Sequence, residues 1–271
     1  MNPIGIFDSG YGGLTVFKNI RENLPQYDYL YLGDNARAPY GSRSFEAIYN
    51  YTLECVRWMF QQGCPLIILA CNTASAKALR TIQQKNLPLE FPEKRVLGVI
   101  RPTAEVIGNF TQTQVIGILG TPGTVASNSY LMEIKKIFPE LKVFQQPCPL
   151  WVPLIEAGEE NSLAADYLVE EYLNSILKQD KNIDTLLLAC THYPLLEANI
   201  LKHLPEGIRL VSQGAIIAAS FKDYLSRHPE IESKITKRGV VKFCTTDAAT
   251  DFDEKGSRFF GEAIRSTQIH L

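Results

Sequence analysis

The 271-residue sequence has no long apolar run and no cluster of basic residues. No window approaches the roughly 18 consecutive apolar residues of a membrane helix, so no membrane partner is expected. Lys and Arg gather only in short pairs such as Lys135 and Lys136, and the formal net charge is -2. This balance argues against nucleic acid as a partner. The start, MNPIGIFDSG, lacks the features of a signal peptide, so we expect a cytoplasmic location.

Several common active-site signatures are also missing. The chain contains no G-x-G-x-x-G, no G-K-[ST], no G-x-S-x-G and no H-E-x-x-H. The stretch DSGYGG (8–13) resembles a phosphate loop only loosely, so nucleotide binding has little support. Six cysteines are scattered without the spacing of a disulfide framework. In a reducing cytosol they are expected to be free thiols.

Hydrophobic residues make up 45% of the chain and charged residues 21%, which is ordinary for a globular protein with a sizeable core. Short apolar runs alternate with longer segments of helical period, and this pattern predicts an α/β fold with mostly parallel sheets. The expected strands are 4–7, 29–33, 66–70, 96–100, 115–120, 141–145, 185–189, 208–212 and 240–245. The expected helices are 13–23, 45–62, 73–85, 124–138, 163–178, 195–203, 214–227 and 255–265.

The helix expected at 45–62 has the clearest signals. Its apolar stripe consists of Ile48, Thr52, Cys55 and Met59, which follow one another at spacings of three and four. Ser44 is expected to cap its start, and the glycine after its last residue to end it.

Two pairs of segments repeat along the chain. IGIFDSGYGGLTV (4–16) resembles IGILGTPGTVASN (116–128), and LIILACNTASA (66–76) resembles LLLACTHYPLL (186–196). The repeat predicts two similar α/β halves that face each other. Ligands of such folds usually bind at the carboxyl ends of the strands, between the halves.

Cys71 and Cys190 occupy matched places in the second repeated pair. Each follows an apolar run and precedes polar residues that can begin a helix, where N–H groups favour a thiolate. A functional role is therefore expected for both. Cys55 lies on the apolar stripe of a predicted helix, Cys64 at the entry to a predicted strand and Cys244 within a strand. All three are expected to be structural, because free cysteines are often buried.

Two facing thiols leave three kinds of site open. A disulfide is disfavoured in the cytosol. A metal site built on Cys190, His192 and a distant cysteine lacks the paired spacing of zinc sites. Acid–base chemistry fits best, because inverting a stereocentre requires a base on one face of a carbon and an acid on the other. Asp8 could tune a thiol or simply cap a helix, and Cys148, between two prolines, stays open between structural and functional roles.

Six blocks in order resemble the bacterial glutamate racemases: GIFDSGYGGLTV, YLGDNARAPYGSRS, ACNTASA, GTPGTVASNSY, CPLWVPLIEAGE and CTHYPLL. The resemblance spans nearly the whole chain. It implies two pseudo-symmetric α/β domains with mostly parallel sheets and an active site in the cleft between them. The first domain would hold 1–98 and 210–271, and the second, inserted domain 99–209. A homodimer is expected, because members of the family are often dimeric.

The resemblance also implies the chemistry. It predicts a racemase that interconverts L-glutamate and D-glutamate without pyridoxal phosphate, metal or other cofactor, and supplies D-glutamate for peptidoglycan. Cys71 would be the base for D-glutamate, assisted by Asp8. Cys190 would be the base for L-glutamate, assisted by His192 and Glu156. The implied substrate contacts are Asp8, Ser9, Tyr40, Gly41, Asn72, Thr73, Thr121, Thr124, Thr191 and His192.

The chain departs from the resembled pattern in places. Gln213 stands where a small or acidic residue is usual, and CTTDAATDF (244–252) differs from the usual tail. The N-terminus lacks the extension of members activated by a cell-wall precursor, so we expect no activation by UDP-muramoyl-alanine. Three alternatives stay open: an aspartate racemase, whose substrate is one methylene shorter, a non-catalytic binding protein, and a thiol redox or zinc protein.

Overall fold

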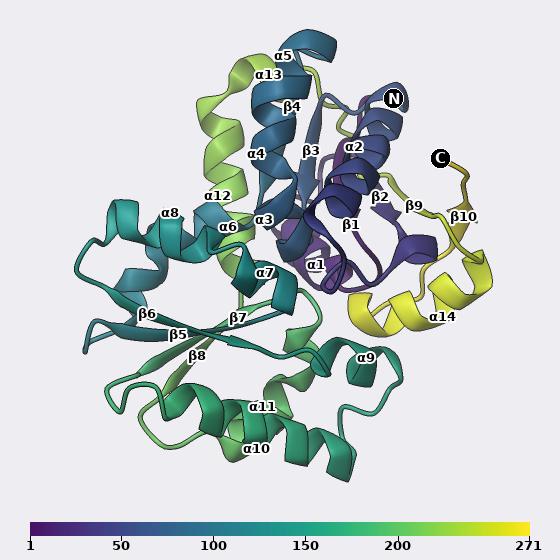
Figure 1. The fold of residues 1–271 in the computed structure, drawn as a ribbon. Helices are drawn as coiled ribbons and strands as arrows, with labels where there is room; N and C mark the ends of the chain where they lie inside the picture. Colours follow the sequence, from purple (N-terminus) through teal and green to yellow (C-terminus); the bar gives the residue numbers. More distant parts are fainter.

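The computed structural model describes all 271 residues, and its ten strands form two separate sheets (Figure 1). The six-stranded sheet has the order β10-β9-β2-β1-β3-β4 and the four-stranded sheet the order β6-β5-β7-β8, with every paired strand parallel. The strands are β1 (Ile4–Asp8), β2 (Tyr29–Gly33), β3 (Leu66–Leu69), β4 (Arg95–Gly98), β5 (Val115–Gly120), β6 (Lys142–Pro147), β7 (Thr185–Ala189), β8 (Arg209–Val211), β9 (Val241–Thr245) and β10 (Ser266–Gln268).

Helices connect successive strands and cover both sheets (Figure 1). The α-helices are α1 (Gly13–Asn23), α2 (Phe45–Gln61), α3 (Asn72–Lys77), α4 (Leu79–Thr81), α5 (Leu87–Glu90), α6 (Ile100–Val106), α7 (Pro122–Ala126), α8 (Ser129–Ile137), α9 (Trp151–Glu156), α10 (Leu163–Leu177), α11 (Glu197–His203), α12 (Gly214–Arg227), α13 (Pro229–Glu232) and α14 (Ala249–Phe260). Shorter helical turns are η1 (Asn35–Arg37), η2 (Ile82–Asn86), η3 (Ile107–Phe110) and η4 (Tyr193–Leu196). None of the helices is long and apolar enough to span a membrane.

The apolar runs form the central strands, as the sequence predicts. Every residue of β1, β2, β3, β5 and β7 is buried, because helices cover both faces of each sheet. Each large apolar side chain that is fully buried in this way contributes roughly 1.5–3 kcal/mol. The α/β class with parallel sheets is therefore confirmed.

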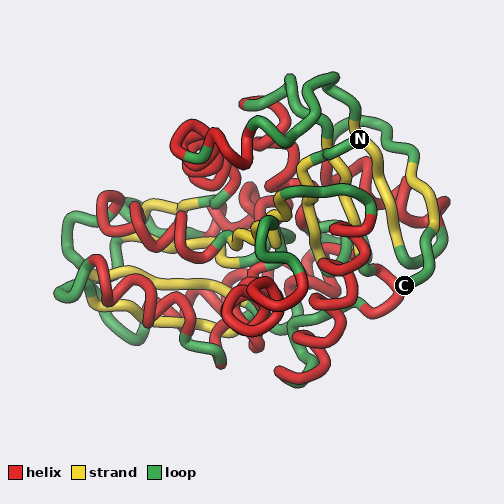
Figure 2. The backbone as a smooth tube through the Cα atoms, turned by 90° about the horizontal axis from the view of Figure 1, so that it is seen from above, coloured by secondary structure: helices red, strands yellow, loops and turns green.

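The repeat in the sequence corresponds to a repeat in topology. In the larger sheet β1 pairs with β2 and β3, and β4 follows β3; in the smaller sheet β5 pairs with β6 and β7, and β8 follows β7. The orders β2-β1-β3-β4 and β6-β5-β7-β8 are thus equivalent. Figure 2 shows the strands as two separate groups, one in each half of the molecule. The expectation of two similar α/β halves is confirmed.

The best-defined helix forms as expected. The Ser44 side chain accepts a hydrogen bond from the Ala47 backbone N–H at the start of α2, and the stripe residues Ile48 and Met59 are fully buried. Gly63 follows the helix with a positive φ of 92°, a conformation that favours glycine and ends helices.

Several helices differ from their predicted bounds. The helix expected at 124–138 is divided into α7 and α8 by Asn128, whose φ of 54° lies in the left-handed region that asparagine tolerates. The helix expected at 255–265 begins earlier, as α14, and ends where Gly261 adopts a φ of 84°. The helix expected at 73–85 becomes α3, α4 and the π-turn η2. The short elements α6, α9 and β10 lack a long periodic pattern and were not predicted.

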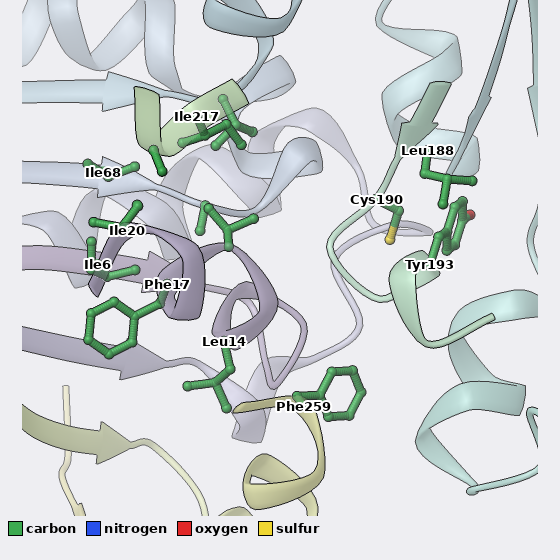
Figure 3. Close-up of a cluster of buried hydrophobic side chains, with 14 of the residues drawn as sticks. Ile6, Leu14, Phe17, Ile20, Ile68, Leu188, Cys190, Tyr193, Ile217 and Phe259 are labelled. Atoms are coloured by element: carbon green, nitrogen blue, oxygen red, sulfur yellow. The ribbon is translucent and has the colours of Figure 1, made fainter. Parts of the chain in front are cut away.

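One apolar cluster of 42 residues spans both halves. It joins Ile6 and Phe17 of the first half to Leu188 and Tyr193 of the second, and Figure 3 shows Cys190 beside Leu188 and Tyr193. The chain crosses between the sheets after β4 and again after β8, where α12 packs on α1. The expected boundary at 209/210 falls inside β8; the domain limits themselves stay a prediction.

Candidate active site

A cavity of about 140 Å³ lies where the carboxyl ends of the two sheets meet. It is smaller than the roughly 300–1,000 Å³ of pockets for drug-sized ligands, so it suits a small metabolite. Its walls include eleven of the thirteen residues predicted for the site: Ser9, Tyr40, Gly41, Cys71, Asn72, Thr73, Thr121, Glu156, Cys190, Thr191 and His192. The other two, Asp8 and Thr124, are fully buried and hydrogen-bond to residues of these walls.

Cys71 follows β3 and caps the first turn of α3. Its sulfur accepts a hydrogen bond from the backbone N–H of Ala74 at 3.4 Å and lies 3.4 Å from the hydroxyl of Ser9. Burial, and then the charge of Asp8, raise the pKa of the Cys71 thiol to about 12 despite these two hydrogen bonds. Cys71 is therefore held as a neutral thiol at neutral pH.

Cys190 follows β7 and has a cationic neighbour. The Nδ1 atom of His192 lies 4.0 Å from the Cys190 sulfur, and its Nε2 atom lies 2.9 Å from a carboxylate oxygen of Glu156, at the end of α9. Burial alone would lower the pKa of His192, but the interactions with Cys190 and Glu156 outweigh it and raise this pKa to about 10. His192 therefore carries a positive charge at neutral pH and favours negative charge on the adjacent sulfur.

Asp8 lies beneath the cavity, between the two thiol environments. Its carboxylate accepts a hydrogen bond from the Gly10 N–H at 2.9 Å and one from the Thr191 hydroxyl at 3.4 Å, so it joins the two halves. Burial raises the pKa of Asp8, and the charge of His192 opposes that rise. A Cβ atom at Gly12 would lie 2.3 Å from the His192 ring, so only glycine allows this close approach.

Hydroxyl groups from both halves meet at another wall of the cavity. The Thr73 hydroxyl, on α3, lies 2.9 Å from that of Thr121, which caps α7. Close by, the Gly123 N–H donates to the carbonyl oxygen of Gly41 at 2.8 Å. The amino ends of α3 and α7 therefore approach one cavity from opposite halves. Such helix ends and hydroxyls supply hydrogen-bond donors suited to a carboxylate.

Some wall residues were not predicted from the sequence. Cys148, whose role the sequence left open, follows β6 and lines the cavity with a fully buried thiol, and burial raises its pKa well above the ordinary value. The signal that could have placed it is its position shortly after the strand predicted at 141–145. The remaining unpredicted wall residues are Gly10, Ala38, Pro39, Ser42, Pro122, Pro149, Val152 and Pro153.

The alternative sites proposed for the two thiols find little support in the geometry. All six cysteines are free. No group of three or more His, Cys, Asp or Glu side chains is arranged to hold a metal ion, so Cys190 and His192 have no third ligand.

The different charges beside the two thiols predict different rates of alkylation. Iodoacetate, a small anion, should modify Cys190 before Cys71 at neutral pH, because the cationic His192 lies beside the Cys190 sulfur, whereas burial and the charge of Asp8 hold Cys71 as a thiol. Peptide mass spectrometry at successive times measures both rates, with the buried Cys64 as an unreactive reference. Faster modification of Cys71 would contradict this electrostatic account.

Comparison with known proteins places the chain in a family. The family model Asp/Glu/Hydantoin racemase matches residues 4–221. Glutamate racemase of Aquifex aeolicus is 42% identical, with 96% of this chain and 95% of that protein covered. The structure of glutamate racemase RacE1 from Bacillus anthracis has a TM-score of 0.89 at 34% identity and covers 100% of this chain and 98% of that one. The Francisella tularensis glutamate racemase, solved in complex with D-glutamate, has a TM-score of 0.86 at 31% identity and covers 99% and 97%. The chain therefore belongs to the Asp/Glu/Hydantoin racemase family and, within it, to the glutamate racemases.

Proposed function

We propose that the protein interconverts L-glutamate and D-glutamate by a two-base mechanism without a cofactor, and that it supplies D-glutamate for peptidoglycan. The observation that carries the proposal is that Cys71 and Cys190 follow equivalent strands of the two halves and line the same small cavity. A pair of like groups, one from each half, meets the requirement for a base and an acid on opposite faces of one carbon.

The two thiols have different charged neighbours, a cationic His192 beside Cys190 and the carboxylate of Asp8 near Cys71. Cys190, beside the cationic His192, is the base that removes the α-proton of L-glutamate. Cys71, held as a thiol by its raised pKa, delivers its own proton to the opposite face of the carbanion. One C–H bond breaks and another forms, and the proton that leaves the substrate stays on Cys190. For D-glutamate the two steps run in reverse, from the form of the protein in which Cys71 has lost its proton and Cys190 carries one.

The surrounding groups stabilise the charge that develops on the substrate. The α-proton of an amino acid is weakly acidic, so donors around the carboxylate must stabilise the carbanion. Asn72 and Thr73 beside one thiol, and Thr191 beside the other, line the cavity and supply such donors. Glu156 accepts from His192 and holds its ring beside Cys190, whereas Asp8 acts on Cys71 through its charge.

The activity can be tested directly. Pure protein dialysed against a chelator and free of pyridoxal phosphate should convert L-glutamate to an equal mixture of enantiomers, so the circular dichroism signal decays to zero. L-aspartate, one methylene shorter, should react more slowly. No decay with glutamate, or a faster decay with aspartate, would refute the proposed substrate.

The cellular role and assembly need separate tests. Expression of the chain should restore growth of a bacterium that requires added D-glutamate, and the Cys71→Ser variant should not. We also propose that the protein is a cytoplasmic homodimer, as is common in this family. Sedimentation should give a mass twice that of the 30.4 kDa chain, and a monomer at all concentrations would refute the dimer.

A further inference from the structure

Gln213 lies where the chain passes from the second half back to the first, and it hydrogen-bonds to Asn72 in the cavity wall. It follows β8 directly, is only 4% exposed, and stands at the start of α12, where the chain returns to the first half. Its Oε1 atom accepts a hydrogen bond from Asn72 Nδ2 at 2.8 Å. Its Nε2 atom donates to the hydroxyls of Tyr130 at 2.6 Å and Thr103 at 2.8 Å. Gln213 itself does not line the cavity.

Gln213 and Tyr130 together hold both ends of the Asn72 carboxamide, its nitrogen and its oxygen. The Tyr130 hydroxyl donates to Asn72 Oδ1 at 2.5 Å, while the Asn72 Nδ2 donates to Gln213. Asn72 is adjacent to Cys71 and lines the cavity. A carboxamide has two N–H donors and two acceptor sites, so one N–H and one lone pair of Asn72 stay free for a ligand.

The direction of each hydrogen bond is fixed by one backbone carbonyl. The Thr103 hydroxyl donates to the carbonyl oxygen of Val99 at 2.9 Å, so towards Gln213 the Thr103 oxygen can only accept. The amino end of the Gln213 carboxamide must therefore face Thr103 and Tyr130, and its oxygen must face Asn72. Tyr130, which accepts from Gln213, then directs its own proton to Asn72. This chain of directed bonds allows a single orientation of the Asn72 amide.

The four side chains come from four different elements: α3 for Asn72, α6 for Thr103, α8 for Tyr130, and the residue before α12 for Gln213. All four are at most 4% exposed, and none is among the buried polar side chains that lack a partner. Both α6, after β4, and Gln213, after β8, lie in the segments where the chain passes from one sheet to the other. The orientation of Asn72 is therefore anchored in the segments that join the two halves.

We propose that Gln213 is a positioning residue, which fixes the carboxamide of Asn72 so that its free N–H and oxygen face the substrate in one orientation at Cys71. This role rests on the proposed racemisation, which Gln213 would affect by holding Asn72 in place. Without this bond, Asn72 could turn its amide or rotate away, and the donor would no longer match the charge that develops in the transition state.

The decisive variant is Gln213→Met, which keeps the length of the side chain and removes its hydrogen bonds. We expect kcat for glutamate racemisation to fall about 10- to 100-fold while KM changes little, because a misplaced group near the reacting carbon affects mainly the transition state. Thr103→Val, which removes only the anchor of the network, should lower kcat by a smaller factor. The control is Thr185→Val. It removes the hydrogen bonds of a fully buried hydroxyl to the Phe110 carbonyl oxygen and to Asp184, at the start of β7, which is the end of that strand away from the cavity.

Stability and kinetics separate a positioning role from a structural one. Urea unfolding of each variant gives the loss of stability, and circular dichroism gives kcat and KM. A drop in kcat for Gln213→Met and Thr103→Val, absent from Thr185→Val at comparable stability, supports the inference. Unchanged kcat in the first two variants overturns it, and Thr103→Val alone decides if Gln213→Met does not fold. If the unmodified protein does not racemise glutamate at all, the proposed function fails instead.

Discussion

Replacing Cys71 or Cys190 with serine is expected to lower kcat/KM for racemisation by about 10²–10⁴-fold, the usual contribution of a positioned acid or base. A serine hydroxyl is a far weaker acid than a thiol, so it can neither hold the proton nor give it up readily at neutral pH. L- and D-glutamate have equal free energies in solution, so every variant must lose kcat/KM equally in the two directions. The overall rate therefore cannot tell which thiol serves which enantiomer.

Exchange of the α-proton with solvent can distinguish the two thiols. In heavy water, Cys71→Ser should still exchange the α-proton of L-glutamate through Cys190, and should lose exchange of D-glutamate. Cys190→Ser should show the reverse. Proton NMR of each enantiomer, incubated separately, measures both rates. Cys244→Ser, a buried cysteine outside the cavity, is the matched control and should keep full activity.

The outcome that contradicts two separate bases is equal loss of exchange from both enantiomers in both variants. That result would mean that one group removes the proton from either face, or that the two thiols act only together. Loss of activity in Cys244→Ser to the same degree would instead indicate a general effect of removing a buried thiol.

Replacing His192 with asparagine is expected to lower kcat by about 10²-fold, the second largest effect of a single substitution. The variant removes the positive charge beside the Cys190 sulfur and leaves Glu156 without its partner. Exchange of the α-proton of L-glutamate should fall more than exchange from D-glutamate, because the proposed mechanism assigns Cys190 to the L-enantiomer. His203→Asn is the matched control, since His203 pairs with Asp166 and does not line the cavity.

The same variant tests the charge of His192 through the pH dependence of stability. The pKa of His192 is raised from 6.5 to about 10 by folding, so its contribution to stability is fully present below about pH 6.5 and is lost as pH rises through about 10. His192→Asn should therefore flatten the fall in the free energy of unfolding over this range. Urea titrations at about pH 6.5 and about pH 10 measure the free energy of unfolding of both proteins. An unchanged pH dependence would show that His192 is not charged in the folded protein.

The sequence predicts the elements that carry their own local signal. The apolar runs of β1, β3, β5 and β7 are buried on both faces, so their pattern is strong, and the repeat places Cys71 and Cys190 at equivalent strand ends. The repeat also predicts that these ends meet at one ligand site. The cavity walls contain most of the predicted residues for this reason.

Features that depend on distant contacts or single dihedral angles could not be predicted in the same way. Gln213 and Asn72 are 141 residues apart in the sequence, and nothing local indicates that their side chains meet. The break at Asn128 depends on one left-handed residue inside a helical pattern. β10 has only three residues and no apolar run, because it pairs at the edge of the sheet.

The central claim is that the two thiols flank one carbon atom from opposite halves of the protein. A crystal structure of this protein with D-glutamate bound tests it most directly. The account predicts the α-carbon between the sulfur atoms of Cys71 and Cys190, one on each face, with the carboxylate against Asn72 and the threonine hydroxyls. Both sulfur atoms on the same face, or a ligand bound away from them, would contradict it.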